Sequence, residues 1–443
     1  MVTKRIKVAT DFGKLRAIAV KGFKSFRDNC ELEVGGLTLL CGRNSAGKSS
    51  FLQPALLLKQ TYFAPVDMGP LAFGGPNVSF DRAAECLWSG NGKGTPASEL
   101  NFGFRFGQTF RVHTFSLSTE KRIELEHVRL AQLGASGYVG LIPGKSVAAA
   151  TIRDFAVPLG ISGAIAEKLT VHRNRCDVRL APPAGDPTFG AFSPGPNLAR
   201  LLGRWMHVPG LRGNPEREYL ATRPQLGNYA GWFHMYTAGY LNLWQKREPA
   251  KLAACEADLA TMGLASRLSV EEVSDVRVSI RVGRTLNPYT KSGADLVNIA
   301  DVGFGVGQVL PVVVALQAAG PEDVVHIEQP ELHLHPEAQV VMGRLLLAAA
   351  LRGATVFAET HSIALVRGVQ AAVADLEAHQ FNADLVRAHW FERDESGATK
   401  VTPTPMTAEG MLPDWPEDLT QAAAQADLRF LEASMAHEFR GKR

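Results

Sequence analysis

Residues 37–50 read LTLLCGRNSAGKSS, and this stretch decides the fold. The run 37–41 is continuously apolar, which is typical of a buried strand. The pattern GxxxxGK[ST] follows directly, and then an apolar segment, residues 49–60, which predicts a helix with Pro54 confining or kinking its first turn. A glycine-rich loop between strand and helix binds phosphate oxygens through backbone N–H groups and the positive end of the helix dipole. The stretch therefore predicts a phosphate-binding loop within an α/β fold.

Each position of this loop has an expected role. The Lys48 ammonium can reach the β- and γ-phosphates of a nucleotide, and the Ser49 hydroxyl can hold Mg²⁺. A chance glycine loop is the alternative, but the strand and helix on either side argue against it. The residues expected to contact the nucleotide are Gly42, Arg43, Asn44, Ser45, Ala46, Gly47, Lys48, Ser49 and Ser50.

A second apolar run, VVHIE at residues 324–328, ends at Glu328 and leads into QPELHLHP. A carboxylate at the end of a strand that faces the phosphate loop can hold Mg²⁺ or one of its waters. The metal ligands expected from the sequence are therefore Ser49 and Glu328, and the expected cofactors are ATP and Mg²⁺.

Two further motifs are weaker when taken alone. The segment DVGFGVGQ, residues 301–308, places glycines at alternate positions before an apolar helix, whose N-terminus offers unpaired N–H groups to an anion. The segment FAETHS, residues 357–362, puts His361 just beyond a strand, where it can hydrogen-bond a γ-phosphate. Glycines that merely allow close packing and a structural histidine are the respective alternatives.

Composition sets the broad class. The chain has 443 residues, 46% hydrophobic residues and a net charge of only +3, which predicts packed globular domains without a general affinity for nucleic acid. Its five cysteines form no CxxC pair, which favours reduced thiols in the cytoplasm. The N-terminal residues lack the apolar core of a signal peptide, and the longest apolar runs are interrupted by polar residues, so we expect no membrane association.

The pattern of expected elements predicts one α/β head with a mixed sheet, assembled from both chain ends and interrupted by an α+β middle domain. Segment LARLLGRWM, residues 198–206, is expected to be helical. A helix is also expected at residues 418–439, with Leu428, Leu431 and Met435 on one face that packs on the head or docks a partner. The expected divisions are 1–117 and 271–400 for the two parts of the head, 118–270 for the insertion and 401–443 for the tail.

Taken in this order, the motifs resemble the ATP-binding-cassette (ABC) type heads of SMC and OLD (overcoming lysogenization defect) ATPases. Residues 15–53 are similar to the opening strands and Walker A motif, and VVHIEQPELHLHP to the Walker B motif and D-loop. The closer resemblance is to a bacterial subfamily of OLD-like ATPases without a fused nuclease, whose EQPE motif, LRGNPEREY segment and tail are similar to those found here. The resemblance covers both chain ends well and the middle thinly.

This resemblance implies an ATP sandwich between two protomers. Glu328 becomes the Walker B acid and His361 the switch histidine, and the signature that caps the partner's γ-phosphate comprises Gly305, Val306, Gly307 and Gln308. The sequence departs from the pattern twice: Gly307 stands where a serine is usual, and no glutamine-containing Q-loop is identifiable between residues 60 and 110.

Gln329 follows the Walker B acid, where the resemblance implies the residue that polarises the attacking water. An amide can orient water but cannot accept its proton at neutral pH. Because general-base help contributes about 10²–10⁴ in rate, we predict tight ATP binding and slow hydrolysis. Glu331 could supply part of the missing base function, but it lies beyond Pro330.

Relatives of such heads act on DNA or in bacterial anti-phage defence beside a separately encoded effector. The residues after His361 contain no DxD pair of the Toprim type, so an effector in trans is expected. Basic residues near the N-terminus and at 172–179 could follow DNA phosphates or simply be solvated strand edges. An SMC-like repair ATPase, a transporter ATPase subunit and a self-sufficient nuclease are the remaining alternatives.

Overall fold

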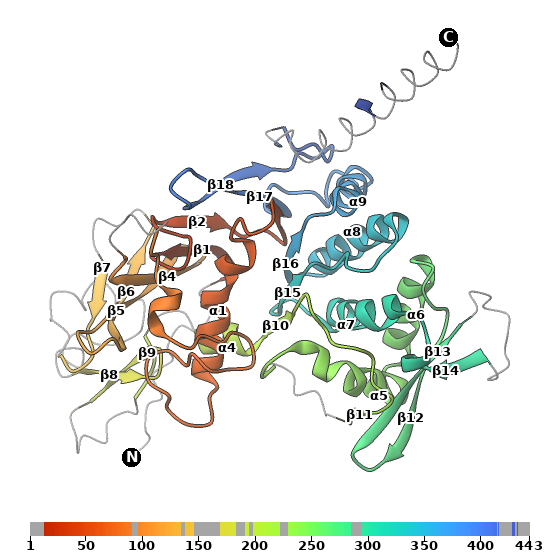
Figure 1. Ribbon diagram of the computed structural model, residues 1–443, viewed down its shortest axis with the longest axis horizontal. Helices are drawn as coiled ribbons and strands as arrows, with labels where there is room; N and C mark the ends of the chain where they lie inside the picture. The colour runs from red at the N-terminus through yellow and green to blue at the C-terminus, as the bar shows by residue number, and fades with distance from the viewer. Residues whose placement is uncertain are drawn as a thin grey trace, which may run out of the picture.

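The computed structural model describes residues 13–90, 96–133, 138–145, 169–182, 191–194, 198–221, 229–284, 295–413, 415, 428, 429 and 432. Three layers form its centre (Figure 1): helices α7–α9, a six-stranded sheet, and α1 with a second, antiparallel sheet. Within these residues, no helix has the length and apolar content needed to cross a membrane.

The central sheet has the strand order β10-β15-β16-β3-β17-β18. Its first five strands are parallel, and β18 pairs antiparallel with β17. The strands are β3 (Leu37–Gly42), β10 (Trp205–Val208), β15 (Val324–Glu328), β16 (Thr355–Thr360), β17 (Val386–Arg393) and β18 (Thr399–Pro405). Since parallel strands end at one edge, the segments after β3, β15 and β16 meet there.

Side-chain alternation along β3 explains why this sheet is covered on both faces. Leu37, Leu39 and Cys41 belong to the core shared with α7–α9, whereas Leu40 belongs to the core shared with α1 and the antiparallel sheet. A fully buried leucine contributes roughly 1.5–3 kcal/mol, so both faces stabilise the strand that carries the phosphate loop. The helices are α1 (Lys48–Tyr62), α7 (Phe304–Ala318), α8 (Pro336–Leu351) and α9 (Ile363–Ala374). Helix α1 continues through Pro54.

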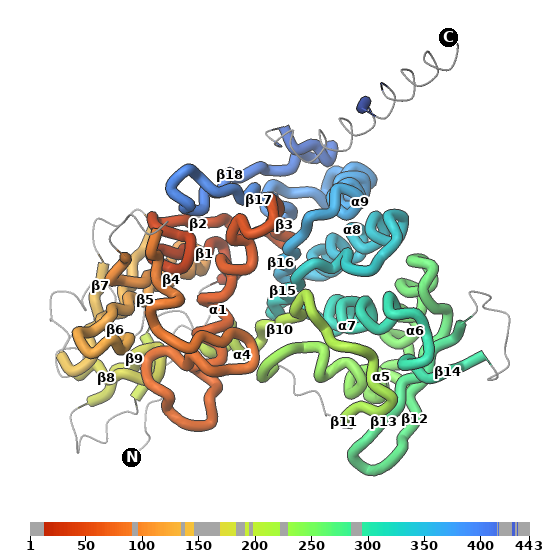
Figure 2. Tube along the Cα trace, viewed as in Figure 1, coloured from red at the N-terminus to blue at the C-terminus, as the bar shows by residue number. Residues whose placement is uncertain are grey.

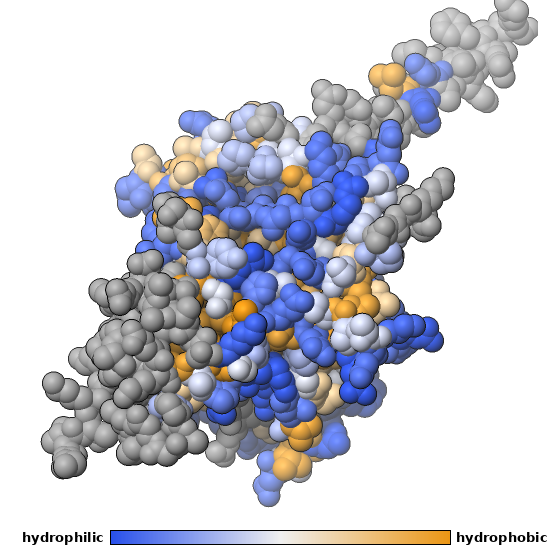
Figure 3. All heavy atoms as spheres, turned by 90° about the vertical axis from the view of Figure 1, so that its left-hand side faces the viewer, coloured by the Kyte–Doolittle hydropathy of each residue, from blue (hydrophilic) through white to orange (hydrophobic). Residues whose placement is uncertain are grey.

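The antiparallel sheet has the order β2-β1-β4-β5-β6-β7 and lies on the α1 side of the molecule (Figures 1 and 2). Its strands are β1 (Leu15–Lys21), β2 (Cys30–Glu33), β4 (Glu99–Phe106), β5 (Thr109–Leu117), β6 (Ile123–Gln132) and β7 (Tyr138–Leu141). Nearby stand the hairpin of β8 (Thr170–Asn174) and β9 (Asp177–Ala181), the helix α4 (Leu198–Gly203) and the 3₁₀ helix η1 (Ala83–Cys86). On this side of the surface, hydrophobic residues form small groups among hydrophilic ones (Figure 3).

A third sheet, β11-β13-β12 with β14 on β13, stands beside α5 and α6 on the other side of the molecule (Figure 2). The elements are β11 (Tyr219–Leu220), η2 (Phe233–Tyr236), α5 (Thr237–Arg247), α6 (Pro249–Thr261), β12 (Leu268–Ser274), β13 (Arg277–Gly283), β14 (Leu296–Asn298) and η4 (Ile299–Asp301). Helices α5 and α6 share the core of α7.

The mixed α/β head formed from both chain ends is confirmed, but the course of the chain differs from the expected divisions. Strand β6 lies beyond residue 117, yet it continues the sheet of β5. Residues 205–208, expected within the insertion and partly within a helix, form β10 at the edge of the central sheet. All four are buried, because they pair with β15 between two apolar layers.

The predicted C-terminal helix falls mostly outside the described residues. Leu428, Arg429 and Glu432 are helical, and Leu428 is exposed. Leu431 and Met435 are not described, so the face they were expected to share stays a prediction.

Candidate functional site

Two glycines shape the phosphate loop between β3 and α1. Gly42 (φ 138°) and Gly47 (φ 104°) adopt left-handed backbone conformations, as does Ser45 (φ 58°). A Cβ atom on Gly42 would lie 2.2 Å from the Phe391 carbonyl oxygen, and one on Gly47 would lie 2.6 Å from Thr399 Oγ1. Both the backbone angles and the close neighbours therefore require glycine.

Lys48, the first residue of α1, is buried with its ammonium held over the loop. Its Nζ donates to the carbonyl oxygens of Gly42 (3.0 Å) and Arg43 (2.8 Å). Burial lowers the pKa of Lys48, whereas the nearby Glu359 carboxylate raises it. The loop thus carries a cation at the position where β- and γ-phosphates would bind.

Glu328 and Glu359 are register partners at the ends of the parallel strands β15 and β16. Glu328 Oε1 accepts from His207 Nε2 at 3.0 Å, and its Oε2 accepts from the Gly210 N–H at 3.1 Å. The amide nitrogen of Asn77 donates to His207 Nδ1 at 3.2 Å, so the proton of a neutral His207 sits on Nε2. Burial lowers the pKa of His207 to about 4, so this imidazole is neutral at pH 7.

Those contacts keep Glu328 ionised. Burial alone would raise the pKa of Glu328, but the hydrogen bonds from His207 and the Gly210 N–H, together with the nearby imidazoles of His326 and His207, outweigh it, so the pKa lies below its usual value. Potential ligand atoms of His207, His326 and Glu328 all lie within 4.8 Å of one another. The His207 imidazole already bonds Glu328, and the His326 imidazole bonds Glu359. Both histidines therefore hold the two carboxylates in place, which is how outer-shell residues orient metal ligands.

Glu359 was not singled out by the sequence, although it lies in FAETHS. Its Oε2 accepts from the Ser49 hydroxyl at 2.5 Å, and its Oε1 pairs with His326 Nε2 at 2.8 Å. The carboxylate is only 2% exposed. Strand register brings it beside Glu328, a relation that no spacing in the sequence displays.

Gln329 and His361 both line a cavity beside the phosphate loop, which is described below. Gln329 has a left-handed backbone (φ 45°), and its N–H donates to the Glu359 carbonyl oxygen at 2.9 Å. Burial, followed by the nearby Lys48, lowers the pKa of His361. The His361 N–H donates to Glu331 Oε1 at 2.9 Å. Through this bond, Glu331 supports the His361 backbone, and it is not among the residues that line the cavity.

These groups converge on one cavity of about 590 Å³. Its wall combines the phosphate loop, the ends of β15 and β16, and a segment that the sequence did not assign to the site. The lining residues are Asn44, Ser45, Ala46, Gly47, Lys48, Ser49, Ser50, Gly210, Leu211, Glu328, Gln329, Glu359, His361 and Arg393. Arg393 Nε fixes the loop by donating to the Ser45 carbonyl oxygen at 2.9 Å. Gln329 is the one glutamine among these lining residues, so the Q-loop stays unassigned.

Residues 209–217, which we name the bridging loop, connect this cavity to the first turn of α7. Arg212 donates to the carbonyl oxygens of Glu328 (2.6 Å), Gln329 (3.2 Å) and Gln308 (3.2 Å). Gln308 Nε2 donates back to the Gly213 carbonyl oxygen at 2.5 Å. The loop therefore holds the Glu328 end of β15 and the α7 N-terminus in one geometry.

The bridging loop also accounts for Gly307. A Cβ atom at this position would lie 2.2 Å from Pro215 Cγ, so Pro215 fills the space that a serine side chain would need. Within the expected signature, Gln308 and Val306 are buried, and Gly305 is half-buried. In this conformation the Gln308 side chain is turned inward to the bridging loop and does not point toward a partner.

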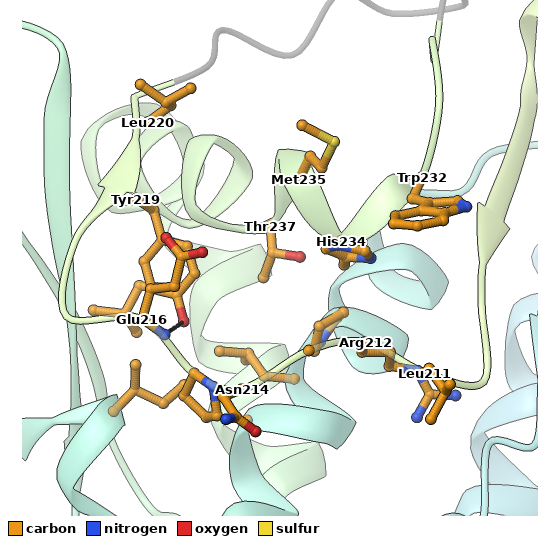
Figure 4. A pocket seen from close by; sticks show the side chains of 17 residues that line it. Leu211, Arg212, Asn214, Glu216, Tyr219, Leu220, Trp232, His234, Met235 and Thr237 are labelled. Carbon is orange, nitrogen blue, oxygen red and sulfur yellow. Dashed lines mark hydrogen bonds between the residues drawn. The ribbon is translucent and has the colours of Figure 1, made fainter. Parts of the chain in front are cut away.

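The bridging loop also lines a second cavity of about 460 Å³ (Figure 4). Leu211 lines both cavities. Figure 4 shows His234 and Thr237, from η2 and the start of α5, across this cavity from Arg212 and Asn214 of the bridging loop; Trp232 and Met235 also line it.

The basic residues at 172–179 are partly engaged in the fold. Arg173 pairs with Asp67 at 2.8 Å, and Arg175 donates to the carbonyl oxygens of Thr61 (3.2 Å) and Ala64. Both guanidinium groups thereby tie the β8–β9 hairpin to the end of α1. These bonds favour a structural role for them over DNA contact.

Comparison with known families finds one match, over residues 255–367, to a profile described as "AAA domain, putative AbiEii toxin, Type IV TA system". This range includes the α7 signature, EQPELHLHP and His361. No curated protein sequence matches. Together with the phosphate loop and the strand order, this match to an AAA domain supports an α/β P-loop fold.

Solved structures that resemble the chain include heads of SMC proteins. One is the Smc head bound to the C-winged helix domain of ScpA (12% identity, 88% of this chain and 97% of that chain, TM-score 0.46). Another is the SMC head domain from Thermotoga maritima (11% identity, 88% and 98%, TM-score 0.35). A third is the Smc head with an extended coiled coil bound to the C-terminal domain of ScpA derived from Pyrococcus furiosus (12% identity, 88% and 96%, TM-score 0.42).

Proposed function

We propose that this chain binds ATP with Mg²⁺ in the 590 Å³ cavity and hydrolyses it slowly. The observation that carries the proposal is convergence: the phosphate loop, Lys48, two strand-end carboxylates and His361 surround one space. Each group suits a different part of a triphosphate, because the loop and ammonium bind anionic oxygens and carboxylates bind a divalent ion.

The donor set fits Mg²⁺. The ion prefers oxygen ligands, and Ser49, Glu328 and Glu359 present a hydroxyl and two carboxylates to the cavity. When bound, Mg²⁺ would neutralise charge on the β- and γ-phosphates. The chain's own part is to hold the phosphates with Lys48 and the loop, and to contact the γ-phosphate through His361.

Gln329 supports slow turnover. Its side chain lines the cavity beside Glu328, but an amide cannot take a proton from water at neutral pH. Glu331, the nearest substitute in sequence, spends one carboxylate oxygen on the His361 N–H. We therefore expect bound ATP to persist, because the site binds the phosphates but lacks a good proton acceptor for the attacking water.

We further propose that two copies enclose the nucleotide as a homodimer, or as part of a larger even-numbered oligomer. The α7 N-terminus of each copy, Gly305 to Gln308, would contact the other's γ-phosphate through its backbone, since the Gln308 side chain is buried. Such a nucleotide-gated switch suits an OLD-like sensor or scaffold in bacterial anti-phage defence that controls a separately encoded nuclease or toxin. The EQPE motif and LRGNPEREY segment support the OLD-like assignment. DNA contact has less support, since Arg173 and Arg175 are engaged within the fold.

Replacing Lys48 with alanine tests the proposed ATP site. Hydrogen bonds to charged groups are worth about 1.5–3 kcal/mol, so Lys48→Ala should weaken ATP binding roughly 10- to 100-fold. Binding would be measured by titration with a fluorescent ATP analogue in the presence of Mg²⁺. Lys145→Ala, which changes an exposed lysine, is the matched control and should bind as the native chain does. Equal nucleotide affinity in both variants would refute the proposal.

A further inference from the structure

We propose that Glu359 is the carboxylate that orients the Ser49 hydroxyl at the divalent-ion site, beside Glu328, which the sequence indicated as an ion ligand. This inference rests on the proposed ATP site and adds a residue to it. The contact that suggests it is short and direct, because Glu359 Oε2 accepts from Ser49 Oγ at 2.5 Å.

The direction of this hydrogen bond matters. A hydroxyl has one proton and two acceptor lone pairs. When Ser49 gives its proton to Glu359, its lone pairs stay available for a cation in the cavity. The second oxygen, Glu359 Oε1, is fixed by His326 Nε2 at 2.8 Å, and the residue is only 2% exposed, so the carboxylate has little freedom to turn away.

Glu328 is held differently. Both of its oxygens are engaged by residues of β10 and the bridging loop, since His207 Nε2 lies 3.0 Å from Oε1 and the Gly210 N–H lies 3.1 Å from Oε2. No hydrogen bond joins Glu328 to Ser49 among the described residues. Both strand-end acids line the cavity, but they have different partners: Glu359 bonds Ser49 and His326, and Glu328 bonds His207 and Gly210.

The charge of Glu359 should affect ATP binding and ion binding in opposite directions. Glu359 contributes negative charge beside the bound phosphates, which opposes ATP binding when no cation is present and favours the cation when it is. Removing this charge should therefore raise metal-free ATP affinity while it weakens ion binding. A general folding defect would lower both.

The experiment compares the native chain with Glu359→Gln, which keeps shape and removes charge. Mn²⁺ serves as the probe ion and is followed by electron paramagnetic resonance in the presence of a non-hydrolysable ATP analogue. We expect the half-saturating Mn²⁺ concentration to rise at least tenfold. Fluorescent ATP analogue binding in EDTA should become tighter. Glu377→Gln, an exposed acid at 76% side-chain exposure, is the matched control and should change neither quantity.

A second variant protects the test against misfolding. Glu359→Asp keeps the charge but withdraws the carboxylate by one methylene, so its Mn²⁺ requirement should lie between those of the native chain and Glu359→Gln. Ser49→Ala should raise the Mn²⁺ requirement, and Ser49→Ala with Glu359→Asp should do so by less than the sum of the two effects, because the residues act through one hydrogen bond.

The outcomes separate this inference from the proposed function. If the native chain binds the analogue and Mn²⁺, but Glu359→Gln and Glu359→Asp need no more Mn²⁺ than it does, the role of Glu359 is refuted and the ATP site stands. Strictly additive effects of Ser49→Ala and Glu359→Asp would also refute it. If the native chain binds no nucleotide at all, the proposed function fails first.

Discussion

Gln329 offers a direct test of the proposed slow hydrolysis, because its amide differs from a carboxylate in a single group. Its side chain lines the phosphate cavity, and its N–H is fixed by the Glu359 carbonyl oxygen at 2.9 Å. Gln329→Glu would place a proton acceptor in the same position without changing the shape of the side chain. Neighbouring carboxylates would raise the pKa of the new acid, which improves it as a base at neutral pH. We expect steady-state ATP hydrolysis to accelerate on the order of 10²-fold.

Phosphate release under saturating Mg²⁺ and ATP measures this change. Glu377→Gln again provides the control, since it alters the charge of an exposed side chain. If Gln329→Glu hydrolyses ATP at the native rate, or if the native chain already turns over many ATP per second without a partner, then the amide is not what limits hydrolysis.

At the residue scale, site residues that belong to one sequence motif were predictable. Site residues that are brought together by the pairing of neighbouring strands were not. The roles expected for Gly42 and Gly47 follow from a local motif, and their backbone angles agree with it. Glu359 and His207 carry no motif spacing of their own. They enter the site because β10, β15 and β16 are in register, which brings His207 to Glu328 and Glu359 to Ser49.

Among the elements, the bridging loop holds the end of β15 and the N-terminus of α7 together, and a substitution at Gly307 tests this role. Gly307→Ala would put a Cβ atom 2.2 Å from Pro215 Cγ, so the loop or the first turn of α7 must shift. Overpacking of this kind costs about 1–3 kcal/mol. We expect a corresponding loss in the free energy of unfolding, measured by denaturant titration.

Gly303→Ala is the matched control, because a Cβ atom at this neighbouring position meets nothing within 4 Å. Pro215→Gly removes the clashing ring, so Gly307→Ala should cost less in that background than in the native chain. An equal cost in both backgrounds would show that Pro215 is not the obstacle, and the departure from serine at Gly307 would need another cause.

The sequence also shows where element prediction fails. Residues 198–206 look helical because their apolar residues recur at helical spacing, and α4 does form over Leu198–Gly203. Trp205 to Val208 then become β10. Four consecutive buried residues are compatible with either element, and the free edge of β15 decides between them. Tertiary pairing therefore overrides the local pattern.

At the scale of the whole molecule, β10 shows that the middle of the chain is part of the central sheet. Residues 118–270 were expected to form an insertion domain that interrupts the head. Instead, β10 extends the central sheet and the bridging loop supplies Gly210 and Leu211 to the phosphate cavity. Both chain ends and the middle thus contribute to one cavity, so a displacement of the bridging loop would move part of the wall of the proposed ATP site.

The position of the α7 N-terminus allows the proposed ATP-driven dimer to be tested. Phe304, in the first turn of α7, is 42% exposed and packs edge-on against His333, in the segment that follows Gln329. The signature therefore lies at the same end of the sheet as the phosphate cavity. If two copies enclose ATP, Phe304→Asp places a negative charge toward the partner's triphosphate and should abolish ATP-driven dimerisation, measured by analytical ultracentrifugation. Its nucleotide affinity as a monomer should stay near the native value. Val66→Asp, on an exposed residue beyond the far end of α1, should still dimerise. A Phe304→Asp chain that dimerises with ATP as the native chain does would place the interface elsewhere.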